Sequence, residues 1–178
     1  MTLNEVKNLL TEQNISFSEQ RYPNVAEFDR HLSPFANLKN APEYRVMALV
    51  IPSRNGHKDI ELQFVERGDG YEFEDLYFGA YSYELFGCLE ADLPQFLVEE
   101  IADIMADDVV IITVNDLKKK KWRGDAAYSK KEDDDFGLPG LKRAMTRIHG
   151  KKSLLSAILG SKIQCEIYDW NTYQCVIK

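Results

Sequence analysis

The sequence has few cysteines and no long hydrophobic run. Its three cysteines, Cys88, Cys165 and Cys175, show no CxxC spacing, which argues against a disulfide framework or a zinc site and fits reduced thiols. No stretch of about 18 consecutive apolar residues is present, so no membrane-spanning helix is predicted. The first residues, MTLNEVKNLL, lack the basic and apolar regions of a secretory signal. We therefore expect a cytoplasmic protein that does not contact a membrane.

The sequence also lacks the short motifs of common enzyme classes. It contains no GxGxxG, GxxxxGK(S/T) or GxSxG pattern, which removes sequence support for nucleotide-binding and α/β-hydrolase chemistry. His31, His57 and His149 are far apart and show neither HxH nor HxxxH spacing. We therefore predict no catalytic residue and no cofactor, and we favour a binding protein over an enzyme.

The composition is that of a folded globular chain. Hydrophobic residues make up 44% of its 178 residues and charged residues 29%, so a sizeable core can form. Nine tyrosines and nine phenylalanines add large side chains for a core or an interface. Because domains usually contain about 100 to 200 residues, we expect residues 1–178 to form a single domain.

Hydrophobic periodicity predicts two helices and then three strands in the first half of the chain. Helical spacing covers Leu3 to Gln13 and Val25 to Leu32, with Ser33-Pro34 ending the second helix. A short strand between these helices is predicted before Pro23. Turn residues then separate three strands of an antiparallel meander, which cover Tyr44 to Ile51, Asp59 to Glu66 and Tyr71 to Phe86. The buried face of the last strand changes side, so a bulge or bend is expected near Asp75.

The second half predicts helices and strands around one long loop. Asp92-Leu93-Pro94 is typical of a helix start, and Val109 to Val114 of a buried strand. Residues Asn115 to Gly137 show no periodicity and are predicted to form a long, mobile loop. The remaining expected elements are a helix from Leu138, a helix over Leu154 to Leu159, and a hairpin of Ile163 to Asp169 and Tyr173 to Ile177. The sequence therefore predicts an α+β fold, with a mostly antiparallel sheet (the central meander plus the C-terminal hairpin) and helices packed on it.

Charge is segregated along the chain, although the net charge is only −7. Sixteen acidic residues and one basic residue, Arg67, lie between Asp59 and Asp116, whereas twelve basic and five acidic residues lie between Lys118 and Lys152. Both blocks are compatible with ordinary solvated surface. Alternatively, the acids form a surface that attracts a basic protein partner, as in an inhibitor, immunity-type or regulatory protein.

The residues predicted to contact such a partner are acids and aromatics of the third meander strand and of the C-terminal hairpin. Three interpretations of the strand residues remain open: a half-exposed sheet with tyrosines beneath loops, a recognition surface, or a carboxylate pair for acid–base chemistry. The aromatics at the hairpin tip either contact the partner or fold back onto the core. The predicted set is Glu72, Glu74, Asp75, Tyr77, Tyr81, Tyr83, Glu84, Trp170 and Tyr173.

A basic segment carries the alternative function. Five cations surround one aromatic residue in Lys118, Lys119, Lys120, Lys121, Trp122 and Arg123. Such a cluster attracts phosphate and other anions, or it forms a solubilising loop anchored by Trp122. Overall acidity argues against nucleic acid as the partner.

The same region contains acids that suggest a weaker alternative, a metal site. Carboxylates are ligands for hard cations such as Mg²⁺, and the candidates are Asp125, Asp133, Asp134 and Asp135. Their spacing does not match an EF-hand, and they are better explained as balancing Lys130 and Lys131 or as accepting hydrogen bonds near the start of the following helix. The leading prediction is a small cytosolic protein that binds a basic partner. The alternative is a metal-dependent enzyme acting on a phosphorylated or anionic substrate through the Lys118–Arg123 loop.

Overall fold

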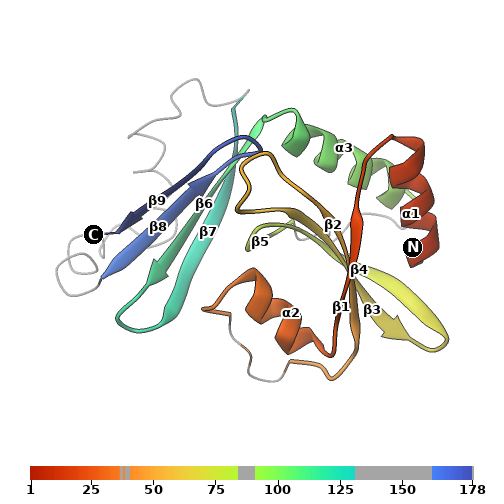
Figure 1. Ribbon diagram of the computed structural model, residues 1–178, viewed down its shortest axis with the longest axis horizontal. Helices are drawn as coiled ribbons and strands as arrows, with labels where there is room; N and C mark the ends of the chain where they lie inside the picture. The colour runs from red at the N-terminus through yellow and green to blue at the C-terminus, as the bar shows by residue number, and fades with distance from the viewer. Residues whose placement is uncertain (37, 39–40, 84–90, 131–161, 178) are drawn as a thin grey trace.

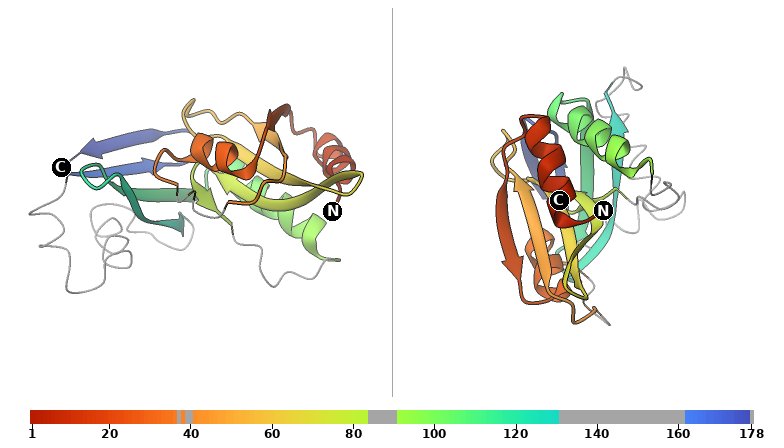
Figure 2. Two further views of the ribbon diagram at one scale, coloured as in Figure 1. Left: turned by 90° about the horizontal axis from the view of Figure 1, so that it is seen from below. Right: turned by 90° about the vertical axis from the view of Figure 1, so that its right-hand side faces the viewer.

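The computed structural model describes residues 1–36, 38, 41–83, 91–130 and 162–177 (Figure 1). The predicted α+β class is confirmed, since the described residues form three helices and two antiparallel sheets. The strands are thus divided between a five-stranded sheet, in the order β1-β2-β3-β4-β5, and a four-stranded sheet, in the order β7-β6-β8-β9. The two sheets lie at opposite ends of the long axis of the molecule (Figure 2).

The predicted meander forms the centre of the five-stranded sheet. Antiparallel pairing joins each strand to the next, and Gly56 and Gly68 adopt positive φ in the two hairpin connections. The strands are β1 (Ser18–Tyr22), β2 (Val46–Ile51), β3 (Ile60–Arg67), β4 (Gly70–Phe78) and β5 (Tyr81–Ser82).

The third meander strand contains the expected bulge but is shorter than predicted. Gln63 lies opposite Asp75 and Phe64 opposite Phe73, so that Glu74 is the extra residue of a bulge. The prediction of one strand as far as Phe86 is wrong, because the chain turns back at Gly79, whose φ is +57°. This turn starts β5, which pairs with the end of β4.

Helices cover both faces of the five-stranded sheet. The elements α1 (Leu3–Glu12) and α3 (Leu93–Met105) pack on one face with side chains such as Leu10 and Ile101. On the other face, α2 (Val25–Leu32) inserts Phe28 between Tyr22 and Val65. The start of α1 is fixed by a capping box in which Thr2 and Glu5 bond each other's backbone.

Because α2 covers the second face, the polar side of β3 does not reach water. Polar and apolar residues alternate along β3, yet Glu61 and Gln63 are as buried as their apolar neighbours. The Nε2 atom of His31, on α2, lies 2.8 Å from Oε1 of Glu61. The other oxygen, Oε2, is buried and has no hydrogen-bond partner within the described residues. Burial raises the pKa of Glu61, and the opposing effect of His31 is smaller.

We expect the Glu61→Gln variant to be about 1 kcal/mol more stable than the parent at pH 8. A carboxyl group with a raised pKa binds its proton more tightly in the folded than in the unfolded state. Stability therefore falls as pH rises from the unfolded value, about 4.3, through the folded pKa. Glutamine keeps the shape of the side chain and carries no charge. The free energy of unfolding, measured in urea, should therefore change less between pH 4 and pH 8 for the variant than for the parent. A variant less stable at pH 8 would show that the buried charge is compensated.

The four-stranded sheet contains a strand where the sequence predicts a loop. It consists of β6 (Val109–Asp116), β7 (Lys121–Ser129), β8 (Ile163–Tyr168) and β9 (Tyr173–Ile177). The prediction of a loop over residues 115–137 is therefore wrong for β7, which is held by pairing with the buried β6. The rest of that loop beyond Lys130, the two helices predicted after it, and Cys88 lie outside the described residues. The predicted C-terminal hairpin is confirmed as β8 and β9.

One set of contacts between the two sheets lies at the turn that follows β2. Asn55 donates its backbone N–H to the carbonyl of Trp170 (3.0 Å) and its side-chain amide to the carbonyl of Asp169 (2.6 Å). Its side-chain oxygen accepts the backbone N–H groups of His57 and Lys58. These bonds fix the turn of the first sheet directly onto the hairpin of the second. One buried apolar cluster also contains residues of both sheets.

Candidate binding site

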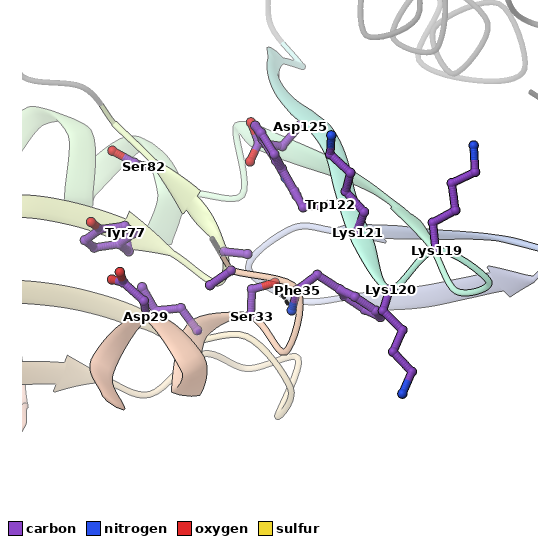
Figure 3. Close-up of a pocket in the computed structure, with 13 residues that line it drawn as sticks. Asp29, Ser33, Phe35, Tyr77, Ser82, Lys119, Lys120, Lys121, Trp122 and Asp125 are labelled. Carbon is purple, nitrogen blue, oxygen red and sulfur yellow. Dashed lines mark hydrogen bonds between the residues drawn. The ribbon is translucent and has the colours of Figure 1, made fainter. Parts of the chain in front are cut away.

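An open groove separates the β6–β7 hairpin from α2 and the end of the five-stranded sheet (Figure 3). Its volume is about 950 Å³. Asp29, Tyr77 and Ser82 line one wall, and Trp122 and Asp125 line the other. We call this space the inter-sheet groove, because its walls come from both sheets.

A second cavity of about 460 Å³ adjoins the groove. Asp29 and Tyr77 line both spaces, so the two meet at these side chains. The described lining of the second cavity contains three carboxylates and no lysine or arginine. We call it the acidic cavity, and its polar and aromatic lining consists of Asp29, Glu74, Asp75, Gln63, Tyr44 and Tyr77.

The packing of α2 sets the position of Asp29. The neighbouring Phe28 is fully buried, with its ring edge-on to Tyr22 at 5.2 Å and to Tyr77 at 5.5 Å between centroids. Asp29 consequently lies at the rim of the sheet beside Tyr77 (Figure 3). Burial raises the pKa of Asp29, and its carboxylate makes no hydrogen bond or ion pair within the described residues. The acidic cavity therefore contains a partly desolvated carboxylate without a cation.

The bulge of β4 places Asp75 and Tyr77 in the same cavity. Asp75 accepts the backbone N–H of Leu76 at 2.8 Å and the hydroxyl of Ser82. The hydroxyl of Tyr77 lies 3.4 Å from Oε1 of Gln63. Burial, and then the charges of the surrounding carboxylates, raise the pKa of Tyr77, so its hydroxyl remains protonated. Negative charge thus accumulates here on Asp29 and Asp75, since Glu74 is paired with Arg67, and a bound cation would reduce the repulsion between them.

The opposite wall of the groove is the hairpin turn between β6 and β7. The buried carboxylate of Asp116 accepts the backbone N–H of Lys119 at 2.9 Å and the guanidinium of Arg123 at 2.6 Å. Arg123 is therefore committed to an internal ion pair. By contrast, Lys119, Lys120 and Lys121 have exposed side chains that extend from the turn (Figure 3), and none forms an ion pair within the described residues. These three residues are called the lysine turn below.

The predicted partner-binding residues of β4 and β5 lie in three places. Asp75, Tyr77 and Glu74 line the acidic cavity. At the outer end of the hairpin, Glu72 and Glu74 flank Arg67, with N–O distances of 3.7 and 2.9 Å. The rings of Tyr81 and Tyr83 lie edge-on to each other, with centroids 5.1 Å apart, and both pack against the core. Glu84 lies outside the described residues.

The two aromatics of the C-terminal hairpin also have internal contacts. Trp170 is only 4% exposed and belongs to the core, which selects the fold-back alternative. Tyr173 stacks on His57 at 4.5 Å between centroids and donates its hydroxyl to Glu166 at 2.6 Å. Neither residue lines the groove or the acidic cavity within the described residues.

The remaining predicted residues divide between the basic segment and the weaker metal alternative. Trp122, 43% exposed, lies beside the lysine turn on the groove wall. Asp125 lines the groove, whereas residues 133–135 lie outside the described residues. Within the described part of the chain, no group of three or more His, Cys, Asp or Glu side chains is arranged to hold a metal ion. No helix in that part is long and apolar enough to cross a membrane.

The cysteine pair of the last hairpin does not face across it. Cys165 lies opposite Val176 and Cys175 opposite Glu166, so their side chains point to opposite faces of the sheet. Both thiols are free; Cys165 is buried and Cys175 is exposed.

No protein-family model, curated protein or solved structure matches this chain. The geometry of the acidic cavity and of the groove is therefore the basis for a function. Sequence patterns did not identify Asp29, Gln63 or Tyr44, because they come from a helix, a buried strand and a connection that only the fold brings together. The available signal was Gln63, which together with Glu61 is a polar residue among the apolar residues of β3.

Proposed function

We propose that this protein binds a basic segment of a partner protein, and that an arginine or lysine side chain of the partner enters the acidic cavity. The observation that carries the proposal is the lining of this cavity: three carboxylates and two tyrosines, with no cationic residue among the described lining residues. This retains the basic partner expected from the charge pattern. It also replaces a broad acidic face by one defined cavity.

The electrostatics of Asp29 favour such a ligand. Its raised pKa reports that the surroundings disfavour the charged carboxylate. An arriving guanidinium supplies the missing counter-charge and hydrogen-bond donors, and its planar fork suits two carboxylates better than an ammonium does. Tyr44, 52% exposed at the cavity, and Tyr77 add ring surfaces for a cation.

The biological class that fits this site is an inhibitor, immunity-type or regulatory protein. Such proteins cover a basic surface of their target and use complementary charge to accelerate association. The net charge of −7 supports long-range attraction of a basic target. In this proposal the cavity provides the specific contact, and the overall charge provides the encounter rate.

The binding test uses N-acetyl-arginine-methylamide as the probe and amide chemical shifts as the readout. We expect saturable shifts around Asp29 and Tyr77 at millimolar probe, and about tenfold weaker binding for the Asp29→Asn variant. This variant should fold, because the carboxylate of Asp29 makes no bond within the described residues. The matched control is Glu72→Gln, which removes an acid of the same hairpin outside the cavity.

The probe should also lose affinity as pH falls through the raised pKa of Asp29, since protonation removes the charge that binds it. N-acetyl-glutamate-methylamide should cause no shifts in the cavity. Equal loss of affinity in the Asp29→Asn and Glu72→Gln variants would show diffuse attraction rather than a site. Absence of shifts with the arginine probe would overturn the proposal.

A further inference from the structure

We propose that the recognised segment carries an anionic side chain as well as its basic one, and that the lysine turn binds this anion across the inter-sheet groove. The inference rests on the proposed function, because the basic side chain in the acidic cavity fixes where the segment lies. It adds the chemistry of the second anchor: a carboxylate or a phosphate monoester on the same segment.

The first support is that the two spaces adjoin. Asp29 and Tyr77 line both, so a segment anchored in the acidic cavity has the groove on the other side of these two residues. The groove volume of about 950 Å³ lies at the upper end of the usual range for ligand sites, about 300 to 1,000 Å³. That is more space than one anchored side chain fills, and the far wall of this space is the lysine turn.

The second support is the unbalanced charge on that wall. Lys119, Lys120 and Lys121 are exposed, consecutive and without an ion pair within the described residues. Their backbone is held in place, because Asp116 accepts the N–H of Lys119 and also binds Arg123. Exposed ammonium groups on one wall of the groove and carboxylates on the other are complementary to a ligand of mixed charge.

The third support is the apolar surface between the two anchors. Phe35 follows α2 at the base of the groove, and Trp122 stands on the opposite wall (Figure 3). Trp122 is exposed and Phe35 is half-buried, and aromatic side chains contribute strongly to peptide and protein recognition. A nucleic acid would use the same lysines and Trp122, but its phosphates would meet Asp29 and Asp125 on the walls. The observations therefore favour a peptide segment.

The test measures fluorescence anisotropy with short labelled peptides that contain one arginine. In each peptide a glutamate, a phosphoserine or a serine is placed either before or after the arginine, and the number of residues between the two is varied. At the best spacing we expect the glutamate or phosphoserine peptide to bind about tenfold more tightly than the serine peptide. Half-molar salt should reduce this gain. The relative affinities of the glutamate and phosphoserine peptides distinguish a carboxylate from a phosphate as the preferred anion.

Two variants separate the anchors. The double variant Lys119→Glu and Lys121→Glu should bind the glutamate and phosphoserine peptides no more tightly than the serine peptide, and its affinity for the serine peptide should be unchanged. The Asp29→Asn variant should weaken all arginine peptides by the same factor and keep the gain. Lys162→Glu, an exposed lysine outside both spaces, is the charge control and should change neither quantity.

The outcomes distinguish the two proposals. If the serine peptide binds through Asp29 and the anionic residue adds nothing at any spacing, the lysine turn is not an anchor and the proposed function stands. If no arginine peptide binds, both proposals fail. Tight binding of oligothymidylate that depends on Lys119 and Lys121, without peptide binding, would assign the lysine turn to nucleic acid instead.

Discussion

The Gly79→Ala variant should be about 3 kcal/mol less stable than the parent protein, because it combines backbone strain with steric overlap. Gly79 has a φ of +57°, where a side chain is unfavourable. A Cβ atom would lie 2.8 Å from the hydroxyl oxygen of Tyr168 and 3.0 Å from its ring. Tyr168 cannot move aside easily, since it is fully buried, packs edge-on to Phe78 and donates a hydrogen bond to the Phe78 carbonyl at 3.0 Å.

The matched control is Gly56→Ala. Gly56 has a similar φ, +68°, but a Cβ atom there would have no neighbour within 4 Å. This variant should therefore lose only the backbone contribution, about 1 kcal/mol. Urea unfolding of both variants and of the Gly79→Ala/Tyr168→Phe double variant measures the contributions of backbone strain and of steric overlap. The double variant should lose less than the sum of its parts, because it lacks the overlapping oxygen. Equal losses for Gly79→Ala and Gly56→Ala would contradict the steric explanation.

The Asp169→Ala variant should lose about 3 kcal/mol at neutral pH, because this carboxylate joins three elements. One oxygen accepts the ammonium of Lys130 at 2.9 Å, and the other accepts the backbone N–H groups of Asn171 and Thr172. Lys130 also bonds Asp107, just after α3. Removal of Asp169 therefore frees the tip of the β8–β9 hairpin and weakens its link to β7 and α3.

The pH dependence of this loss follows from two shifted groups. Burial alone would raise the pKa of Asp169, but the bonds from Lys130 and Thr172 outweigh it and lower the pKa. Burial likewise opposes the raised pKa of Lys130, which its two carboxylate partners produce. The stabilisation should therefore be complete between about pH 4 and pH 10. It should fade as pH falls through the folded pKa of Asp169 or rises through that of Lys130.

Urea unfolding of the parent and the Asp169→Ala variant at pH 7 and near pH 2 tests this expectation. The two proteins should differ most at pH 7 and converge in acid. Asp107→Ala is the control, since it removes the other partner of Lys130 and only a long bond to Asn171 (3.4 Å), and leaves the hairpin tip bonded to Asp169. A constant difference across this range would show that the carboxylate charge does not contribute.

Local signals determined which elements could be predicted. The bounds of α2 agree with the sequence because Asn24 caps its start and Ser33-Pro34 ends it. The β8–β9 hairpin likewise has turn residues between two alternating strands. In contrast, β7 has the sequence KWRGDAAYS, which contains little preference for a strand. Its conformation comes from pairing with β6, a contact that no local pattern encodes.

The candidate site was partly predictable for the same reason. Asp75 and Tyr77 stood out because they lie on one strand rich in acids and tyrosines. Asp29 did not, since its role depends on how α2 lies on the sheet. The same pattern also selected Tyr83 and Trp170, which pack against the core or within it. Composition identifies the residue types of a site, whereas burial decides which of them can touch a ligand.

The long sequence separation of the Asn55 contacts indicates the order in which parts of the molecule fold. The hydrogen bond from Asn55 to the Asp169 carbonyl spans 114 positions, so its formation requires closure of a very long loop, whereas the meander needs only neighbouring turns. During synthesis from the N-terminus, the described lining of the acidic cavity, residues 25–93, is available well before the C-terminal hairpin emerges. The inter-sheet groove has to wait for β6 and β7. A nascent chain would thus acquire its attraction for basic groups first and its full selectivity last.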